Sequence, residues 1–292
     1  VGKGAVYVGR GDAALELCGV RRELSGVQAG VRCLRRRHAE GYHYLIVNHG
    51  TKPLDGWVRL AVPARTVVVL DALTGSSGVA ESRPEAGGGT EVRLYLEPAS
   101  SVLLRTFDTR VVAGVPFRFA RPGTELFKVS GPWQVRFVAG GPELPKACEA
   151  SELASWTGNG DPETVRFGGT AVYRTAFDAP AAYIDKPIIL DLGRVEVSAR
   201  VRLNGAEIGP AIMTPYRLLL PQGVRAGHNE LEVEVTNLGA NRIRDLDMRK
   251  VPWRIFQDIN FVDIRYKGFD ARQWPVRDSG LLGPVRLLEC QE

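Results

Sequence analysis

The sequence predicts an all-β protein built from two antiparallel β-sandwich domains, and three features carry this prediction. The segment VEVSARVRL alternates apolar and polar residues, so one face of a strand collects the apolar side chains Val195, Val197, Ala199, Val201 and Leu203. Asn204-Gly205 follows directly, the pair that best tolerates the positive φ angles of a two-residue hairpin turn. Leu231, Val233 and Val235 then alternate with glutamates, as expected for a second strand with one face in water.

Composition agrees with short strands and excludes several classes of protein. The 292 residues include 33 Gly and 18 Pro, and turn signals recur every ~8–12 residues. Apolar residues make up 44%, enough for a sizeable core, but no window approaches the ~18 consecutive apolar residues of a membrane span. The net charge is +5, yet the one dense basic run lacks the interleaved aromatic residues of a single-strand binding platform: Arg32, Arg35, Arg36 and Arg37. We therefore expect neither nucleic-acid binding nor a membrane span.

The residues that commonly bind metals or cofactors are scattered. The four cysteines have no C-x-x-C spacing and are expected to be free thiols, and the four histidines form no H-E-x-x-H motif. Gly9, Gly11 and Ala14 satisfy the looser dinucleotide fingerprint, but no second βα unit follows it. We predict no cofactor, with a structural calcium ion bound by Asp245 and Asp247 as an alternative.

The expected domain organisation has four parts. Residues 1–38 hold a short buried strand (Gly4–Gly9) and a helix (Asp12–Cys18) with Asp12 as its N-cap. Because the sequence begins at Val1 with neither Met nor a signal peptide, we interpret this part as a βα remnant of a preceding region in a longer polypeptide. The other three parts are a small β-sandwich of four to six strands (39–110), a Pro/Gly-rich linker (111–126) and a larger sandwich (127–292).

The larger sandwich carries motifs in a familiar order. Residues 169–177 read GTAVYRTAF, residues 190–205 read LDLGRVEVSARVRLNG, and residues 279–287 read SGLLGPVRL. This order resembles the galactose-binding-like jelly roll of glycoside hydrolases, of the family 2 sugar-binding type. The run from Asn241 to Leu287 further resembles the C-terminal end of the bacterial α-L-rhamnosidases of glycoside hydrolase family 106.

The resemblance implies where catalysis takes place. A glycosidase needs two carboxylates about 5–5.5 Å or about 6.5–9.5 Å apart, and in this family they are expected on a (β/α) barrel. Such a barrel needs ~250 residues of alternating strand and helix, a pattern that this sequence does not have. We therefore predict no catalytic residue here. The expected function is that of a non-catalytic accessory region of an exported, secreted or periplasmic, glycoside hydrolase.

The candidate functional segment is the tail from Asn241 to Asp278, which lacks the alternation of a strand and reads as a long loop. It is dense in arginine, aspartate and aromatic residues, the types that bind sugar hydroxyls and sugar C–H faces. The candidate carbohydrate-binding residues are Arg242, Asp245, Trp253, Asp263, Tyr266, Trp274 and Asp278.

Three interpretations of this tail stay open. It packs on the catalytic domain of the same polypeptide, it binds a rhamnose-containing glycan, or its salt bridges simply brace a long loop. The alternatives for the whole chain are a purely structural β-sandwich fragment with no sugar site and a stand-alone glycosidase. Whether the chain alone is an enzyme is not decided by the sequence.

Overall fold

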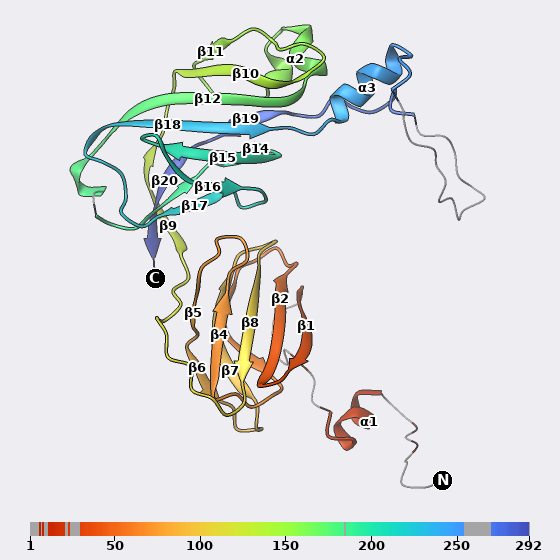
Figure 1. The fold of residues 1–292 in the computed structure, drawn as a ribbon, viewed down its shortest axis with the longest axis vertical. Coiled ribbons are helices and arrows are strands. Elements are labelled where there is room, and N and C mark those ends of the chain that lie inside the picture. Colours follow the sequence, from red (N-terminus) through yellow and green to blue (C-terminus); the bar gives the residue numbers. More distant parts are fainter. Residues whose placement is uncertain are drawn as a thin grey trace. The chain divides into compact units, whose positions relative to one another are not determined.

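The computed structural model describes residues 6, 8, 11–20, 23, 30–183, 185–253 and 270–291 (Figure 1). The chain divides into two compact units, Val1–Arg121 with Glu292, and Pro122–Gln291. Nearly all regular structure is antiparallel β-strand, so the predicted all-β sandwich class is confirmed. None of the helices in the described part of the chain is long and apolar enough to cross a membrane.

The first unit holds a five-stranded sheet (order β1-β2-β8-β4-β5) and a three-stranded sheet (order β3-β7-β6). The strands are β1 (Val31–His38), β2 (Gly41–Asn48), β3 (Leu54–Leu60), β4 (Thr66–Leu70), β5 (Ser77–Val79), β6 (Ser82–Pro84), β7 (Thr90–Leu96) and β8 (Ser101–Phe107). Alternate residues of both sheets form the core of this unit, with Tyr44, Ile46, Val58, Leu94 and Leu104 fully buried.

The start of the chain differs from the prediction. Helix α1 spans Gly11–Leu17, so Asp12 is its second residue and not its N-cap. Val6 and Val8, the described residues of the expected buried strand, are 92% and 98% exposed and lie in no strand. Within the described part of the chain no strand pairs with them.

The second unit is a sandwich of a six-stranded sheet (order β11-β10-β12-β18-β15-β16) and a four-stranded sheet (order β17-β13-β20-β9), with a short β14-β19 pair. Its strands are β9 (Arg121–Lys128), β10 (Trp133–Gly141), β11 (Cys148–Ala150), β12 (Gly168–Ala179), β13 (Ile188–Asp191), β14 (Arg194–Glu196), β15 (Ser198–Leu203), β16 (Ala206–Ala211), β17 (Arg217–Leu220), β18 (Gly227–Thr236), β19 (Gly280–Gly283) and β20 (Arg286–Gln291). Its helices are η1 (Trp156–Gly158), α2 (Pro162–Arg166), η2 (Ala181–Tyr183) and α3 (Ala240–Met248).

The predicted hairpin turn is confirmed. Asn204 has φ 53° and Gly205 has φ 80°, and Leu203 pairs with Ala206 across them, so the two residues form the loop that joins β15 to β16. Val201 and Leu203 point into the core and Arg200 points outward, as the alternation predicts.

The strand expected over residues 195–203 is in fact two strands. β14 pairs with β19, whereas β15 pairs with β16 and β18, so the chain changes partner at Val197. Val197 is only half-buried, although Val195 and Ala199 on either side are buried. The alternation predicts which side chains point inward, but it does not predict which sheet each half joins.

The linker expected over residues 111–126 is shorter than predicted. β9 begins at Arg121, inside that stretch, because its backbone pairs at the edge of the four-stranded sheet beside β20.

A row of polar side chains crosses the outward face of the six-stranded sheet. Directly opposed residues share a face, and from β11 to β16 the row reads Glu149, Gln134, Arg174, Glu232, Arg202 and Glu207. Glu232 lies at its centre and accepts hydrogen bonds from Arg174 Nε and Arg202 Nη1, both at 2.6 Å. Burial by itself raises the pKa of Glu232, but the two guanidinium groups outweigh it, so the pKa lies below its ordinary value of 4.5.

The first prediction concerns the turn. Gly205→Ala should lower the free energy of unfolding by about 1 kcal/mol, because a Cβ is disfavoured at φ 80° even though the space around Gly205 is open. Gly158→Ala is the matched control, since a Cβ there also meets open space but φ is not positive. Urea unfolding followed by tryptophan fluorescence measures both; equal losses in the two variants would contradict the assignment of the turn.

The second prediction concerns pH. Because the folded-state pKa of Glu232 is depressed, its carboxylate stabilises the fold above the ordinary pKa, and that stability is lost as pH falls through the lower folded pKa. Glu232→Gln should therefore destabilise the protein at about pH 7 and flatten the loss of stability on acidification to about pH 3. Glu230→Gln is the control, because Glu230 is 75% exposed on the same strand. An unchanged acid limb in Glu232→Gln would refute the prediction.

Candidate functional site

The candidate tail, which connects β18 to β19, begins with a helix. α3 covers Ala240–Met248, so the expectation of a loop over the whole tail is wrong for its first part. The signal that was overlooked is the spacing of charges: Asp245 follows Arg242 by three residues and precedes Arg249 by four, the separations at which helix side chains meet. The described residues run on to 253 and then include 270–279, a segment that we call the strap.

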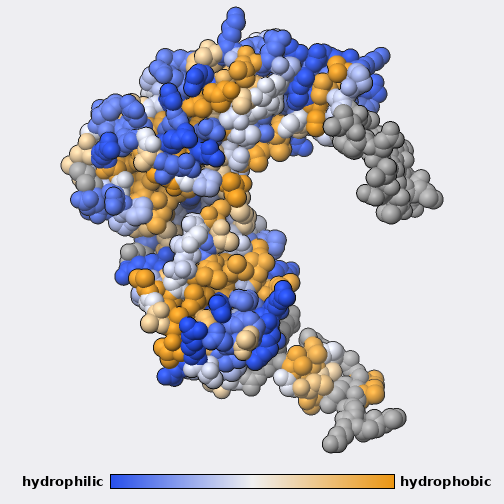
Figure 2. All heavy atoms as spheres, in the orientation of Figure 1, coloured by the Kyte–Doolittle hydropathy of each residue, from blue (hydrophilic) through white to orange (hydrophobic). Residues whose placement is uncertain are grey.

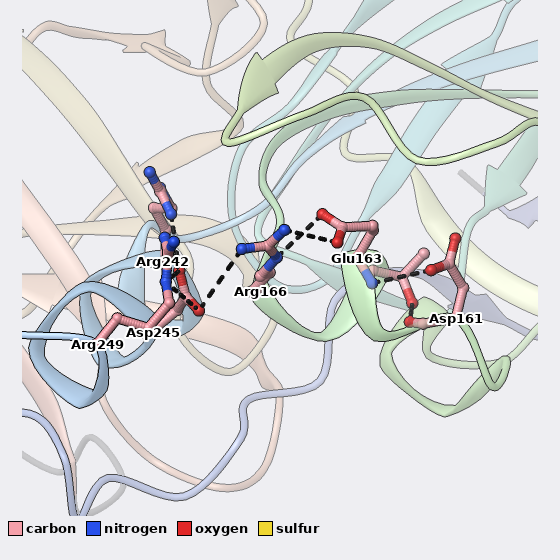
Figure 3. A network of polar contacts seen from close by, with 7 residues as sticks. Asp161, Glu163, Arg166, Arg242, Asp245 and Arg249 are labelled. Carbon is pink, nitrogen blue, oxygen red and sulfur yellow. Dashed lines mark hydrogen bonds and ion pairs between the residues drawn. The ribbon is translucent and has the colours of Figure 1, made fainter. Parts of the chain in front are cut away.

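Asp245 is the centre of a network that connects α3 to α2 (Figure 3). Its Oδ2 lies 2.7 Å from Arg242 Nη1 and 2.7 Å from Arg249 Nη2, and its Oδ1 lies 4.0 Å from Arg166 Nη1. Arg166 in turn binds Glu163 at 2.6 Å within α2. Since the Asp245 side chain is only 15% exposed, these pairs are better shielded from solvent than surface salt bridges.

Asp247, two residues further along the chain, connects the end of α3 to the strap. Its Oδ1 accepts a hydrogen bond from Trp253 Nε1 at 2.7 Å, and its Oδ2 accepts one from the backbone N–H of Ala271 at 2.8 Å. Ala271 is fully buried, so this carboxylate fixes the beginning of the strap against the helix end.

A buried group of amides and hydroxyls holds the other end of the strap. Asn241 donates to the carbonyl of Arg277 and accepts from its N–H, both at 2.8 Å. Ser279 donates its N–H to Ser155 Oγ at 3.0 Å, and its Oγ accepts from Asn237 Nδ2 at 2.9 Å. The backbone on both sides of Asp278 is thus rigidly positioned, although Asp278 itself is exposed.

Residues 272–278 of the strap are exposed, and among them Trp274, Arg277 and Asp278 are of the types that bind sugars. Trp274 is 36% exposed, and its backbone is held by Arg244 Nε on its carbonyl at 2.8 Å and by the Ala271 carbonyl on its N–H at 3.0 Å. Asp278 pairs with Arg194 Nη2 at 2.7 Å. An exposed indole on a fixed backbone is suited to stack on a sugar ring or to pack on a protein surface.

The structure brings only some of the predicted site residues together. Arg242 and Asp245 are in contact, Trp253 is half-buried on Asp247, and Asp278 is paired with a residue of another strand. Asp263 and Tyr266 lie outside the described residues. A groove on β10, β11 and β12 of the second unit is lined by none of these residues. The described residues of the tail therefore provide an exposed surface on a well-held backbone.

The alternative of a calcium ion at Asp245 and Asp247 does not fit the structure. Three guanidinium groups surround the Asp245 carboxylate, and they repel a cation. Both oxygens of Asp247 already accept hydrogen bonds from N–H groups. None of the four cysteines, all of which lie among the described residues, forms a disulfide.

A second surface was not predicted from the sequence. On the outward face of the five-stranded sheet, opposed leucines form a row from β1 to β4: Leu34, Leu45, Leu103 and Leu70. Leu34 is 65% exposed and Leu45 is 38% exposed. Figure 2 shows hydrophobic residues gathered over these strands. The opposite face of the same sheet also carries apolar residues, in the core, so this sheet is apolar on both sides.

We predict that the strap depends on Asn241. Asn241→Ala should lower the free energy of unfolding by about 2 kcal/mol, because it leaves the backbone N–H and carbonyl of Arg277 without their partner. It should also speed amide hydrogen exchange in the strap. Gln273→Ala, a change of another amide in the exposed part of the strap, is the control and should change neither quantity. Unaltered exchange in Asn241→Ala would show that other contacts hold the strap.

Comparison with known proteins points to glycosidases. No protein-family model matches the chain. A putative beta-glucuronidase of Formosa agariphila is 30% identical over 177 residues, which cover 54% of this chain and 15% of that protein.

The structure of a rhamnosidase from Novosphingobium sp. PP1Y matches with a TM-score of 0.70 and 29% identity, over 94% of this chain and 26% of the rhamnosidase. The chain thus spans well under a third of either protein. The chain therefore has the fold of a glycosidase-related β-sandwich region, and its sequence is about 30% identical to the matched parts of these two proteins.

Proposed function

We propose that this chain is a non-catalytic accessory region of an exported α-L-rhamnosidase-like glycoside hydrolase of family 106. The observation that carries the proposal is the match of almost the whole chain, both units included, to about a quarter of a rhamnosidase. In this proposal only the residues before β1 would continue the preceding catalytic region, because β1 (Val31–His38) pairs with β2 inside the first sandwich. The two sandwiches support the catalytic barrel.

The state of the tail carboxylates supports a non-catalytic role. A general acid or nucleophile must be free to exchange a proton or to attack the substrate. Asp245, Asp270 and Asp278 are instead held by arginines at 2.7 Å, and Asp247 accepts two N–H groups. Their ion pairs and hydrogen bonds within the described part of the chain support a structural role for these carboxylates.

The leucine row supports docking to the catalytic domain of the same polypeptide. Exposed antiparallel sheets usually present polar residues to water, and a contiguous apolar patch commonly marks an interface. Arg32 and Arg36 flank the row on β1 and have no carboxylate partner among the described residues. The complementary surface would therefore be apolar with an acidic margin, which suits the outer helices of a barrel.

The strap supports a second role, binding of a rhamnose-containing glycan. Trp274 provides an exposed indole, and Arg277 provides a guanidinium on a backbone that Asn241 holds from both sides. These groups match the apolar face and the hydroxyls of a sugar.

The docking role is tested in the complete polypeptide that the gene encodes. Leu34→Glu with Leu45→Glu should reduce rhamnosidase activity and thermal stability together, because two charges would be buried in the interface. Leu73→Glu is the matched control, since Leu73 is 44% exposed in a turn outside the row. A double variant that behaves like the control, or a gene that encodes no catalytic domain, would overturn the proposal.

The catalytic and glycan-binding roles are tested on this chain alone. It should not hydrolyse 4-nitrophenyl α-L-rhamnopyranoside, and L-rhamnose should change its tryptophan fluorescence saturably in a way that Trp274→Ala abolishes. Turnover that is lost in Asp245→Asn would identify an enzyme instead. A flat fluorescence response to L-rhamnose would remove the sugar-binding role of the strap and leave the docking role.

A further inference from the structure

A groove lies on the outward face of the six-stranded sheet, away from the strap. It has a volume of about 510 Å³, which is within the range of small-molecule sites. Its walls come from β10, β12 and the edge strand β11 with the residue before it: Gln134, Val135, Arg136, Ala147, Cys148, Glu149, Val172 and Arg174.

Arg174 at the side of the groove and the arginines farther across this face have glutamate partners. Arg174 and Arg202 share Glu232 at 2.6 Å, and Arg200 lies 3.8 Å from Glu207. Such pairs satisfy both charges, so the middle and the β16 side of the face offer little to a ligand.

The groove also contains polar side chains that are not engaged in such ion pairs. Gln134, Arg136 and Glu149 have no side-chain hydrogen bond or ion pair with any described residue. Gln134 lies opposite Glu149 on β11 and opposite Arg174 on β12, so the amide, the carboxylate and a guanidinium stand in one row. Arg136 lies one outward position along β10.

The floor of the groove is apolar. Val172 lies directly opposite Arg136 and is 6% exposed, although it belongs to the outward face. An apolar floor beside unpaired donors and acceptors is the composition of a site that binds a polar ring with one hydrophobic side.

We propose that this groove binds a saccharide residue that carries a carboxylate, a uronic acid. The guanidinium of Arg136 would pair with the ligand carboxylate, Gln134 and Glu149 would hydrogen-bond to ring hydroxyls, and Val172 would contact the C–H face of the ring. Glu149 repels the ligand carboxylate and so orients it toward Arg136. The inference extends the proposed role of the chain in carbohydrate recognition, but it concerns a different surface from the strap.

The test is a titration of the 292-residue chain with the methyl glycosides of glucuronic acid and galacturonic acid, with the matching glucosides and galactosides as uncharged controls, followed by heteronuclear NMR. At least one uronide should shift the resonances of Gln134 and Arg136 saturably, and its uncharged counterpart should bind at least about tenfold more weakly. Arg136→Gln should weaken uronide binding by a similar factor. Arg200→Gln, an exposed arginine on the same face, should leave it unchanged.

Each other result overturns the inference. Absence of binding by both uronides, equal binding of charged and uncharged sugars, or equal effects of Arg136→Gln and Arg200→Gln would each exclude a uronate site in the groove. Trp274→Ala distinguishes a site in the groove from a site on the strap, because it should abolish the response to L-rhamnose without changing uronide binding. Failure of the rhamnosidase proposal in the complete polypeptide would leave the groove measurement valid.

Discussion

The second unit depends on the pairing of β12 with β18 at the centre of the six-stranded sheet. The two strands pair from Thr170 with Thr236 to Ala179 with Gly227, and their inward side chains form the middle of the core. At the end of β18, Asn237 accepts the N–H of Gly169 and donates to the Phe167 carbonyl and to Ser279 Oγ. The same strand pair therefore positions the outward groove on one side and, through this asparagine, the strap at its end.

Local signals predicted the parts of this fold that depend on local physics. The Asn204-Gly205 turn requires positive φ, and the alternation near Val201 requires only that one face be buried; both follow from adjacent residues. The change of partner at Val197 and the early start of β9 depend on strands distant in sequence, so no neighbouring residue could reveal them. Helix α3 was predictable from its charge spacing, but the density of arginine and aspartate was interpreted as sugar chemistry.

The candidate site shows the same division. Composition placed Arg242 and Asp245 in one set of candidate sugar-binding residues. In the structure they pair within α3, and Asp245 also faces Arg166 of α2, so this carboxylate braces two helices. The leucine row could not be recognised, because Val68 and Leu70 lie in the run VVVL, which is apolar at every position and so does not show which face meets the core. Which face of this strand meets the core can be determined only once its neighbouring strands are known.

The arginines between residues 32 and 37 have a physical consequence that depends on their position in the sheet. Among the described strands β1 is the outermost of its sheet, and an edge strand can pair with the edge of another molecule. Two strands that approached edge to edge here would bring like charges together beside exposed leucines. The run therefore opposes fibril-like self-association at the edge of a sheet that carries exposed leucines.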